Sequence, residues 1–497
     1  MALQYRVFRV FKKIIVIHGR KDFVMAQVNP LNADSNVTTY QPLLDPESSL
    51  MVFLGEPAIT TITFFKNADA TLSSSWLKDR LTQVCKANPW LTGRLIRDKK
   101  IHKNVLLEIP RVIEADVDSI ICNEGKVLSG ISSQTKYEDL VNAILKSNAV
   151  VGPGYKLIGQ RNLRVAKFTM VPVSNGEVAL IFSLTHTISD GFTYYKILSM
   201  LSGEIEELSS VRKHDYVPAS IEAIGVKEDK FLKSTSFLLC CLKSMLCGSK
   251  ANMEARYIDP EAIRAIKTEA KHRFISTNDI ITSTFARATD TDILLMAINL
   301  RSRVKGTDSN DAGNYELVLT HDAVSASTPE AIRKSLQEGP PFKRDGDTQL
   351  PGFFKTIKSK VALITNWSFP TVFKADLKLF DSGGAKNVPI HLHLPVYNPK
   401  DIAFPLAIIF RPKAEKLAIL FGGSAREVSY DKLVEAGAPI GEPICNAMFP
   451  AGSGRARAEP KHTISLRSFA ASVVFRLGRL SSSASSLEHR GAPKRAN

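Results

Sequence analysis

The sequence predicts an α/β fold composed of two similar halves. The chain has 497 residues, and because a single hydrophobic core stops growing at about 250–300 residues, we expect more than one core. Runs of β-branched and apolar residues, typical of strands, alternate along the chain with segments whose apolar residues recur at helical spacing. The simplest division is an N-terminal half over 37–215, a linker or crossover over 216–256 and a C-terminal half over 257–449.

The N-terminal half begins with clear strand and helix patterns. β-branched residues are frequent in 57–65, which we expect to be a strand, and 73–88 has apolar residues at helical spacing. Two further strands are expected over 167–172 and 178–184. They flank Asn175-Gly176, a dipeptide typical of two-residue hairpin turns, so we expect them to pair as a β-hairpin.

The C-terminal half continues the alternation of strands and helices. A helix is expected over 280–288, and Thr277 or Asn278 can cap it, because either side chain can accept a hydrogen bond from the first turn. The other segments with regular patterns are a strand near 254–258, a helix over 260–270, a strand over 293–300, and a hairpin formed by 406–410 and 417–421.

The positive charge of the chain lies at its ends. The formal net charge is +16, of which residues 1–25 carry +5 and residues 451–497 carry +7, leaving only +4 for the rest. We therefore expect a basic N-terminal extension over 1–36 and a basic, Ser/Ala-rich, disordered tail over 450–497. The nearly balanced body has no RNP-like, zinc-finger or helix-turn-helix pattern, so we expect no nucleic-acid partner.

Cysteine usage and hydropathy indicate a cytoplasmic protein. The six cysteines show no CxxC pair, which is typical of a reducing, intracellular compartment. No run approaches the ~20 apolar residues of a membrane span, so we expect no transmembrane segment. An organelle is the alternative location if residues 1–24 are a targeting peptide. We expect the protein to be a monomer.

The most informative segment is 179–195, which reads ALIFSLTHTISDGFTYY. An apolar strand ends near His186, where a sheet opens to solvent, and a helix is expected from Gly191 to Gly203. Asp190 lies in the intervening turn, where it can fix the local geometry or bind a cation. Gly191 permits a tight backbone conformation at the helix entry. From the pattern alone, a catalytic histidine and a buried, hydrogen-bonded histidine explain the segment about equally well.

Further segments extend this HxxxDG motif into a family resemblance. They are 88–95 (NPWLTGRL), 276–283 (STNDIITS), 299–303 (NLRSR), 312–315 (AGNY) and 365–370 (TNWSFP). In order and spacing the chain resembles the chloramphenicol-acetyltransferase-like superfamily, which includes BAHD acyltransferases, peptide-synthetase condensation domains and wax-ester synthases. Residues 376–379 (DLKL) stand where BAHD enzymes have DFGWG, so the chain resembles a divergent member. The resemblance implies two chloramphenicol-acetyltransferase-like halves with an active-site channel at their interface.

The resemblance also implies a role for each site residue. His186 would be the general base that deprotonates a hydroxyl or amine acceptor as it attacks the thioester of an acyl-CoA. Asp190 would be structural and paired with Arg301. Acyl-CoA would be a co-substrate, with no bound cofactor and no metal, and the partner would be a small-molecule alcohol or amine. Three consecutive residues would line the site, with the amide of the second donating to the developing oxyanion: Thr365, Asn366 and Trp367.

Two alternative functions stay open at this point. A condensation-type enzyme would take carrier-bound acyl groups, but such domains usually have two consecutive histidines, and position 185 is Thr. A catalytically silent binding protein of the same fold would not need to retain His186. Thiol release from acyl-CoA, measured with a panel of alcohols and amines, would distinguish a CoA-dependent transferase from these two alternatives.

Two weaker patterns favour structural explanations. His391 and His393 share one strand face, yet no third metal ligand is nearby, so we expect an ordinary strand. The apolar segment 231–247, which contains Cys240, Cys241 and Cys247, could lie on a membrane surface, but packing against the body is favoured.

Overall fold

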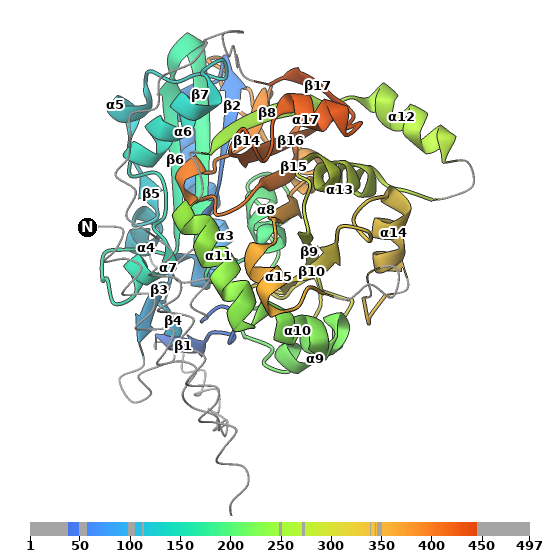
Figure 1. Ribbon diagram of the computed structural model, residues 1–497. Helices are drawn as coiled ribbons and strands as arrows, with labels where there is room; N and C mark the ends of the chain where they lie inside the picture. Colours follow the sequence, from blue (N-terminus) through green and yellow to red (C-terminus); the bar gives the residue numbers. More distant parts are fainter. Residues whose placement is uncertain are drawn as a thin grey trace, which may run out of the picture. The chain divides into compact units, whose positions relative to one another are not determined.

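The computed structural model describes residues 38–48, 57–97, 105–111, 114–247, 251–270, 274–337, 339–342, 344 and 350–444 (Figure 1). All of them belong to one compact unit, Met1–Ala447. The predicted basic extension over 1–36 and the predicted tail over 450–497 lie outside the described residues.

A five-stranded sheet holds the first part of the chain, in the order β14-β2-β7-β6-β5. The predicted hairpin is confirmed: β6 and β7 pair antiparallel, and the turn residues Asn175 and Gly176 have φ values of 64° and 65°. The strands of this sheet are β2 (Ile59–Lys66), β5 (Ile121–Cys122), β6 (Ala166–Val173), β7 (Glu177–Leu184) and β14 (Leu392–Pro395).

Strand β14 comes from the predicted C-terminal half but pairs with β2, with Leu392 opposite Phe64. The sheet therefore uses residues from both sides of the predicted linker. The division into halves at 215 and 257 stays a prediction. A smaller sheet in the order β1-β4-β3 is also described. Its strands are β1 (Thr39–Pro42), β3 (Arg94–Arg97) and β4 (Val105–Ile109).

Helix α3 confirms the helix expected over 73–88. Asp69 caps its N-terminus by accepting a hydrogen bond from the Leu72 amide, and one face of the helix is buried. The chain then enters a short 3₁₀ helix at Pro89, because proline cannot continue an α-helix. The helices of this region are α3 (Ala70–Ala87), α4 (Glu114–Asp118), α5 (Gly125–Leu128), α6 (Tyr137–Lys146), α7 (Gly154–Leu157), α8 (Gly191–Ser199), η1 (Pro89–Thr92) and η2 (Ser174–Gly176).

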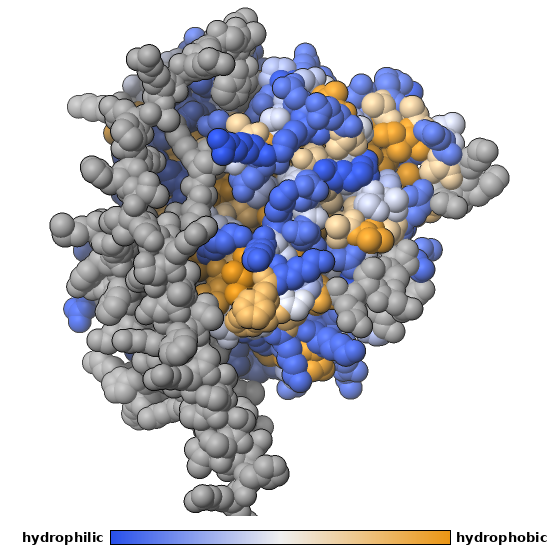
Figure 2. All heavy atoms as spheres, in the orientation of Figure 1, coloured by the Kyte–Doolittle hydropathy of each residue, from blue (hydrophilic) through white to orange (hydrophobic). Residues whose placement is uncertain are grey.

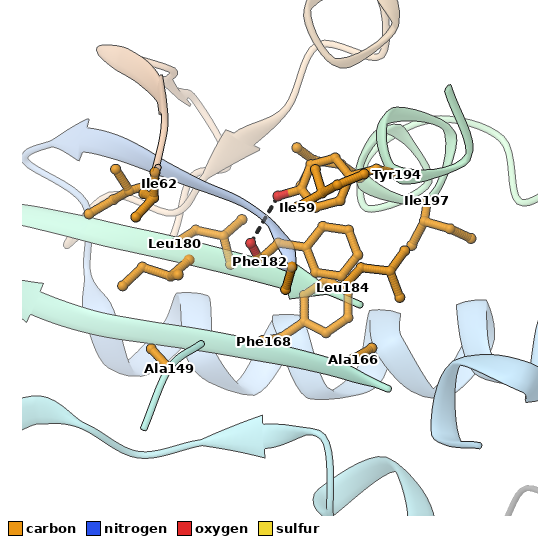
Figure 3. Close-up of a cluster of buried hydrophobic side chains, with 14 of the residues drawn as sticks. Ile59, Ile62, Ala149, Ala166, Phe168, Leu180, Phe182, Leu184, Tyr194 and Ile197 are labelled. Atoms are coloured by element: carbon orange, nitrogen blue, oxygen red, sulfur yellow. Dashed lines mark hydrogen bonds between the residues drawn. The ribbon is translucent and has the colours of Figure 1, made fainter. Parts of the chain in front are cut away.

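A column of aromatic rings fixes α8 to the first sheet. Phe168 of β6 stacks on Phe182 of β7 at 4.2 Å between ring centroids, and Phe182 stacks on Tyr194 of α8 at 4.4 Å. Figure 3 shows these three rings within the buried cluster. Stacked, buried aromatic pairs add to the stabilisation gained from burial alone. The loop between β7 and α8 is therefore anchored at both of its ends.

A second sheet of seven strands holds most of the later part of the chain, in the order β10-β9-β11-β15-β16-β8-β17. The hairpin expected over 406–421 is confirmed by the antiparallel pair β15 and β16. Strand β11 is parallel to both β9 and β15. The strands are β8 (Asn252–Ile258), β9 (Ile293–Asn299), β10 (Glu316–Asp322), β11 (Val361–Asn366), β15 (Leu406–Lys413), β16 (Lys416–Gly423) and β17 (Ile440–Pro443).

Helix α13 (Thr277–Ala288) begins three residues earlier than the expected start at residue 280. Its cap is Ser276, whose hydroxyl accepts from the Asp279 amide while the Asp279 carboxylate accepts from the Ser276 amide. The prediction that Thr277 or Asn278 caps the helix is therefore wrong, because Asp279 stands at the position that completes a capping box with Ser276.

The remaining elements of this region are short. They are α9 (Tyr216–Ile224), α10 (Val226–Leu232), α11 (Thr235–Cys247), α12 (Pro260–Glu269), α13 (Thr277–Ala288), α14 (Pro329–Gln337), α15 (Phe353–Lys358), α16 (Thr371–Lys374), α17 (Tyr430–Glu435), η3 (Pro399–Asp401), β12 (Lys378–Leu379) and β13 (Val388–Pro389).

Helix α11 packs against the protein, as the sequence favoured. Phe237, Cys240 and Cys241 form a buried cluster with residues of β9 and β11, and α11 lies beside α15 (Figure 1). Burial raises the pKa of the Cys241 thiol to about 12, so this cysteine stays protonated and is a poor nucleophile. On the face drawn in Figure 2, hydrophobic residues appear in small groups among hydrophilic ones. None of the described helices is long and apolar enough to span a bilayer.

Candidate active site

His186 lies in the loop that follows β7, and the side chain of Asn314 holds it. The imidazole Nδ1 is 3.1 Å from Asn314 Oδ1, and Asn314 Nδ2 donates to the His186 carbonyl oxygen at 2.7 Å. A carbonyl oxygen can only accept, so the amide nitrogen of Asn314 must face it and Oδ1 must face the ring. Nδ1 therefore carries the hydrogen, and in the neutral ring Nε2 holds the lone pair.

Asp190 caps helix α8 and pairs with Arg301. Its Oδ1 accepts from the Thr193 amide at 2.9 Å, and its Oδ2 accepts from Arg301 Nη1 at 2.5 Å and from the Tyr315 amide at 3.1 Å. Both side chains of the ion pair are 1% exposed. The carboxylate is thus engaged by the helix, by Arg301 and by the segment that carries Asn314, and it does not hold the His186 ring.

The guanidinium of Arg301 is fully satisfied, which explains why it can be buried. Nη1 also donates to Asn299 Oδ1, Nη2 donates to Thr193 Oγ1 and the Gly313 carbonyl, and Nε donates to the Asp311 carbonyl. All five N–H groups of an arginine are engaged in this way. The pair therefore joins three segments: the start of α8, the end of β9 and the loop before β10.

A second buried ion pair, which the sequence did not reveal, supports the same loop. Arg212 Nε donates to Glu47 Oε2 at 2.8 Å, and both side chains are buried. Arg212 Nη2 donates to the Ile188 carbonyl in the loop 185–190 between β7 and α8, which we call the histidine loop. Glu47 Oε1 accepts from the main-chain amide of Asn314 at 3.0 Å. Glu47 and Arg212 are 165 residues apart. No local motif could have connected them.

Gly191 does not have a left-handed backbone, so a positive φ is not the reason for glycine at the helix entry. A Cβ at this position would make ordinary van der Waals contact with Trp367, at 3.4 Å from Cδ1 and 3.5 Å from Nε1. The structural role expected for Gly191 stays a prediction. The conformationally demanding glycine is Gly313, with a φ of 151° and a Cβ position only 2.9 Å from the Tyr315 ring.

A pocket opens beside the histidine loop and is lined by residues from both predicted halves. Asp190, Gly191 and Phe192 line one side. The ends of β9, β10 and β11 and the segment after β11 line the other, with Ala297, Asn299, Glu316, Thr365, Asn366, Trp367 and Phe369. All three residues expected to line the site, Thr365 to Trp367, are among them. The implied channel between the halves stays a prediction.

Asn366 has a fixed orientation in this pocket. Its Oδ1 accepts from the Ser368 amide and hydroxyl, at 2.9 and 2.7 Å, so its Nδ2 must be the donor toward Asn278 Oδ1 at 3.0 Å. An amide nitrogen carries two hydrogens, so the other can still donate to a ligand. Its predicted donation to an oxyanion stays a prediction.

Glu316, the first residue of β10, brings a carboxylate to His186. Its Oε1 is 3.6 Å from the imidazole Nε2, and the two side chains are 31% and 19% exposed. The residue also lines the pocket. No motif in the sequence marks Glu316, and only the pairing of Glu316 with Asn299 across β10 and β9 places it here.

Other titratable groups nearby are unsuited to proton transfer at neutral pH. Burial raises the pKa of the Tyr315 hydroxyl to about 12. His393 is buried in the first sheet, where its ring nitrogens contact Thr63 Oγ1 and Tyr195 Oη at 2.8 and 3.1 Å, and burial lowers its pKa to about 3. Within the described residues, no cluster of three or more His, Cys, Asp or Glu side chains could hold a metal ion.

Comparisons by sequence give no match, since neither a family model nor a curated protein matches the chain. Comparisons by structure do. Vinorine synthase superposes with a TM-score of 0.51 at 14% identity, covering 85% of this chain and 98% of that one. TRI101 of F. sporotrichioides, complexed with coenzyme A and T-2, gives 0.49 at 14% identity, covering 82% and 99%. The condensation domain of the Monacolin K polyketide synthase MokA gives 0.49 at 9% identity, covering 81% and 96%.

Of these three structures, vinorine synthase has a TM-score above 0.5, and the fold assignment rests on it. The low sequence identity is what a divergent relative would show, and similarity at this level establishes a shared fold without a shared activity. The α/β fold expected from the sequence is thus confirmed, and the chain has the chloramphenicol-acetyltransferase-like fold of vinorine synthase.

Proposed function

We propose that this protein is an acyltransferase that moves an acyl group from acyl-CoA to a hydroxyl or amine acceptor, with His186 as the general base. The observation that carries the proposal is the fixed tautomer of His186. Asn314 lies against Nδ1, and the opposite ring nitrogen, Nε2, lies 3.6 Å from Glu316, a residue that lines the pocket. TRI101, on a similar fold, is described in complex with coenzyme A, and this supports acyl-CoA as the co-substrate.

The proposed reaction needs one proton acceptor and one oxyanion donor. His186 Nε2 removes the proton from the acceptor as its heteroatom attacks the thioester carbonyl. The carbonyl oxygen becomes an oxyanion, toward which the second amide hydrogen of Asn366 donates. Collapse of the intermediate breaks the C–S bond, and the imidazolium returns its proton to the coenzyme A thiolate.

The surrounding ion pairs serve this chemistry by holding the base in place. Asp190 with Arg301 and Glu47 with Arg212 join the histidine loop to the segment of Asn314. A base held in one orientation avoids the cost of ordering it during the reaction. Location and oligomeric state stay the predictions made from the sequence, namely the cytoplasm and a monomer.

The test is thiol release from acyl-CoA in the presence of a panel of alcohols and amines. His186→Ala is expected to lower turnover by about 10²–10⁴-fold with little change in melting temperature. His391→Ala is the matched control, because His391 is half-buried directly before β14, where its main-chain amide donates to the Phe64 carbonyl of the first sheet. Turnover of His186→Ala equal to that of the wild type would refute the proposal.

A further inference from the structure

Two neighbouring phenylalanines at the start of α15 are exposed to solvent. Phe353 is 43% exposed and Phe354 is 72% exposed, and their rings contact each other at 5.3 Å between centroids. Single exposed apolar side chains are ordinary, whereas contiguous ones mark contact surfaces. A side chain as exposed as Phe354 projects from the protein rather than lining a groove.

Helix α15 presents these rings from a fixed position. On its inner side Thr356 is fully buried, and its hydroxyl lies 2.7 and 3.0 Å from the carbonyl oxygens of Pro351 and Gly352, to which it can donate. From the neighbouring helix α11, Lys243 Nζ donates to the Ile357 carbonyl at 3.0 Å. Turning the phenylalanines inward would break these bonds.

Lysines lie around the two rings. Lys355 and Lys358 are exposed on α15, and Lys243 is exposed on α11 beside it. The segment 350–360 contains no acidic residue. Figure 2 shows hydrophobic and hydrophilic residues next to one another over these two helices, which Figure 1 labels in the same orientation. The surface is therefore both aromatic and positively charged.

Two carboxylates near the end of α15 are engaged by a further lysine. Lys360 Nζ forms an ion pair with Asp290, and the Lys360 main-chain amide donates to Asp292 Oδ2 at 2.8 Å. These carboxylates offset the charge of Lys360. The other three lysines keep their positive charge beside the phenylalanines.

We propose that this surface binds a membrane that contains anionic phospholipids. We call it the α15 patch, and it consists of Lys243, Phe353, Phe354, Lys355 and Lys358. The rings enter the interfacial region of the bilayer, and the ammonium groups meet the negatively charged headgroups. The basic ends of the chain, with +5 in residues 1–25 and +7 in residues 451–497, add to the attraction.

The composition of the α15 patch favours a lipid surface over a protein partner. Lysine is depleted at the centre of protein–protein interfaces, whereas proteins that bind at membrane surfaces combine aromatic residues with lysines. The proposal concerns where the protein binds and does not depend on the proposed acyltransferase activity.

The test is co-sedimentation of the full-length protein with vesicles of phosphatidylcholine alone or of an equal mixture with phosphatidylserine. The wild type is expected to bind the mixed vesicles more strongly, and less so as salt is raised. Phe353→Ser/Phe354→Ser is expected to weaken this binding by about 10-fold or more. Lys355→Gln/Lys358→Gln is expected to weaken it by about 10- to 30-fold.

Matched controls lie outside the α15 patch. Phe274 is 75% exposed, so Phe274→Ser removes an equally exposed ring. Lys86 and Lys305 are exposed as well, so Lys86→Gln/Lys305→Gln removes the same net charge. Both control variants are expected to bind the mixed vesicles as the wild type does, and melting temperatures check that every variant is folded.

A second measurement locates the contact on the protein. In Phe354→Trp, lipids with brominated acyl chains are expected to quench the fluorescence of the added tryptophan. In Phe274→Trp they are expected to quench no more than in the wild type. This readout separates the α15 patch from the basic ends, because attraction through the ends alone does not insert residue 354.

Three results would overturn the proposal. The first is equal vesicle binding by the wild type and both patch variants, with no added quenching in Phe354→Trp. The second is a wild-type protein that binds neither kind of vesicle. The third is a wild-type dimer that Phe353→Ser/Phe354→Ser converts to a monomer, because the α15 patch would then bind a second copy of the chain.

Discussion

Breaking the Asp190–Arg301 pair is expected to destabilise the protein strongly. Each side chain is 1% exposed, and removing one partner of a buried ion pair typically costs ~3–5 kcal/mol because the other charge is left uncompensated. Arg301→Met should fall at the upper end of this range. It also removes the donors of Asn299 Oδ1, Thr193 Oγ1 and two backbone carbonyls. Asp190→Asn should fall at the lower end, because the bond from the Thr193 amide can persist.

The assay is urea unfolding followed by tryptophan fluorescence, with turnover measured on the same samples. The double variant Asp190→Asn/Arg301→Met should cost less than the sum of the two single variants, by about 0.5–3 kcal/mol. The matched control is the pair Arg264–Glu261, which has the same 2.5 Å separation but side chains that are 69% and 71% exposed. Its removal should cost less than about 1 kcal/mol, since water screens exposed ion pairs.

Two results would refute this reasoning. Strictly additive losses of free energy would mean that the two charges are not coupled. A large loss of turnover in Asp190→Asn with unchanged unfolding would mean that Asp190 acts on His186, in the manner of a triad. The geometry favours the structural role, because Nδ1 of His186 contacts Asn314 while the Asp190 oxygens accept from Thr193, Arg301 and Tyr315.

Three further predictions concern stability. Burial lowers the pKa of His321 to about 4, against 6.5 when unfolded, so the folded state should lose stability as pH falls below 6.5, by about 2 kcal/mol at pH 5.0. His321→Leu should remove this part of the acid sensitivity, as urea midpoints at pH 7.5 and 5.0 will report. Ser276→Ala should cost about 1 kcal/mol in urea unfolding, and Thr277→Ala less. Trimming 1–24 and 455–497 should leave melting temperature and turnover unchanged, since all described elements lie within 39–443.

Local chemistry made several elements of the fold predictable from the sequence. The β6–β7 hairpin follows from two residues that tolerate positive φ, and the end of α3 follows from one proline. The cap of α13 was harder, because Ser276, Thr277 and Asn278 are all competent caps. The choice among them depends on which one has an acidic residue three positions later. β14 could not be assigned to the first sheet from sequence, because strand pairing over such a separation leaves no local pattern.

The residues of the candidate site also differ in how far they could be predicted, depending on whether their partners are near or far in the sequence. His186 and Asp190 could be identified from the sequence because both lie in one short loop and form a contiguous motif. Asn314 is 128 residues from His186, and its role depends on two hydrogen bonds that only the folded loop creates. The pairing of Glu47 with Arg212 is equally non-local. Such residues carry no periodic or spacing signal, so a single sequence cannot distinguish them from ordinary polar residues.

Glu316 shows the same limit at the candidate site. No pattern in the sequence marks Glu316, and a glutamate is usually a solvated surface residue. Its position beside Nε2 arises from two separate features: the loop 312–315, which fixes Asn314 and Tyr315, and the register that sets Glu316 opposite Asn299. His186 could be found from a contiguous motif. Glu316, whose carboxylate lies 3.6 Å from it, could not, because its position depends on how two strands and a distant loop meet.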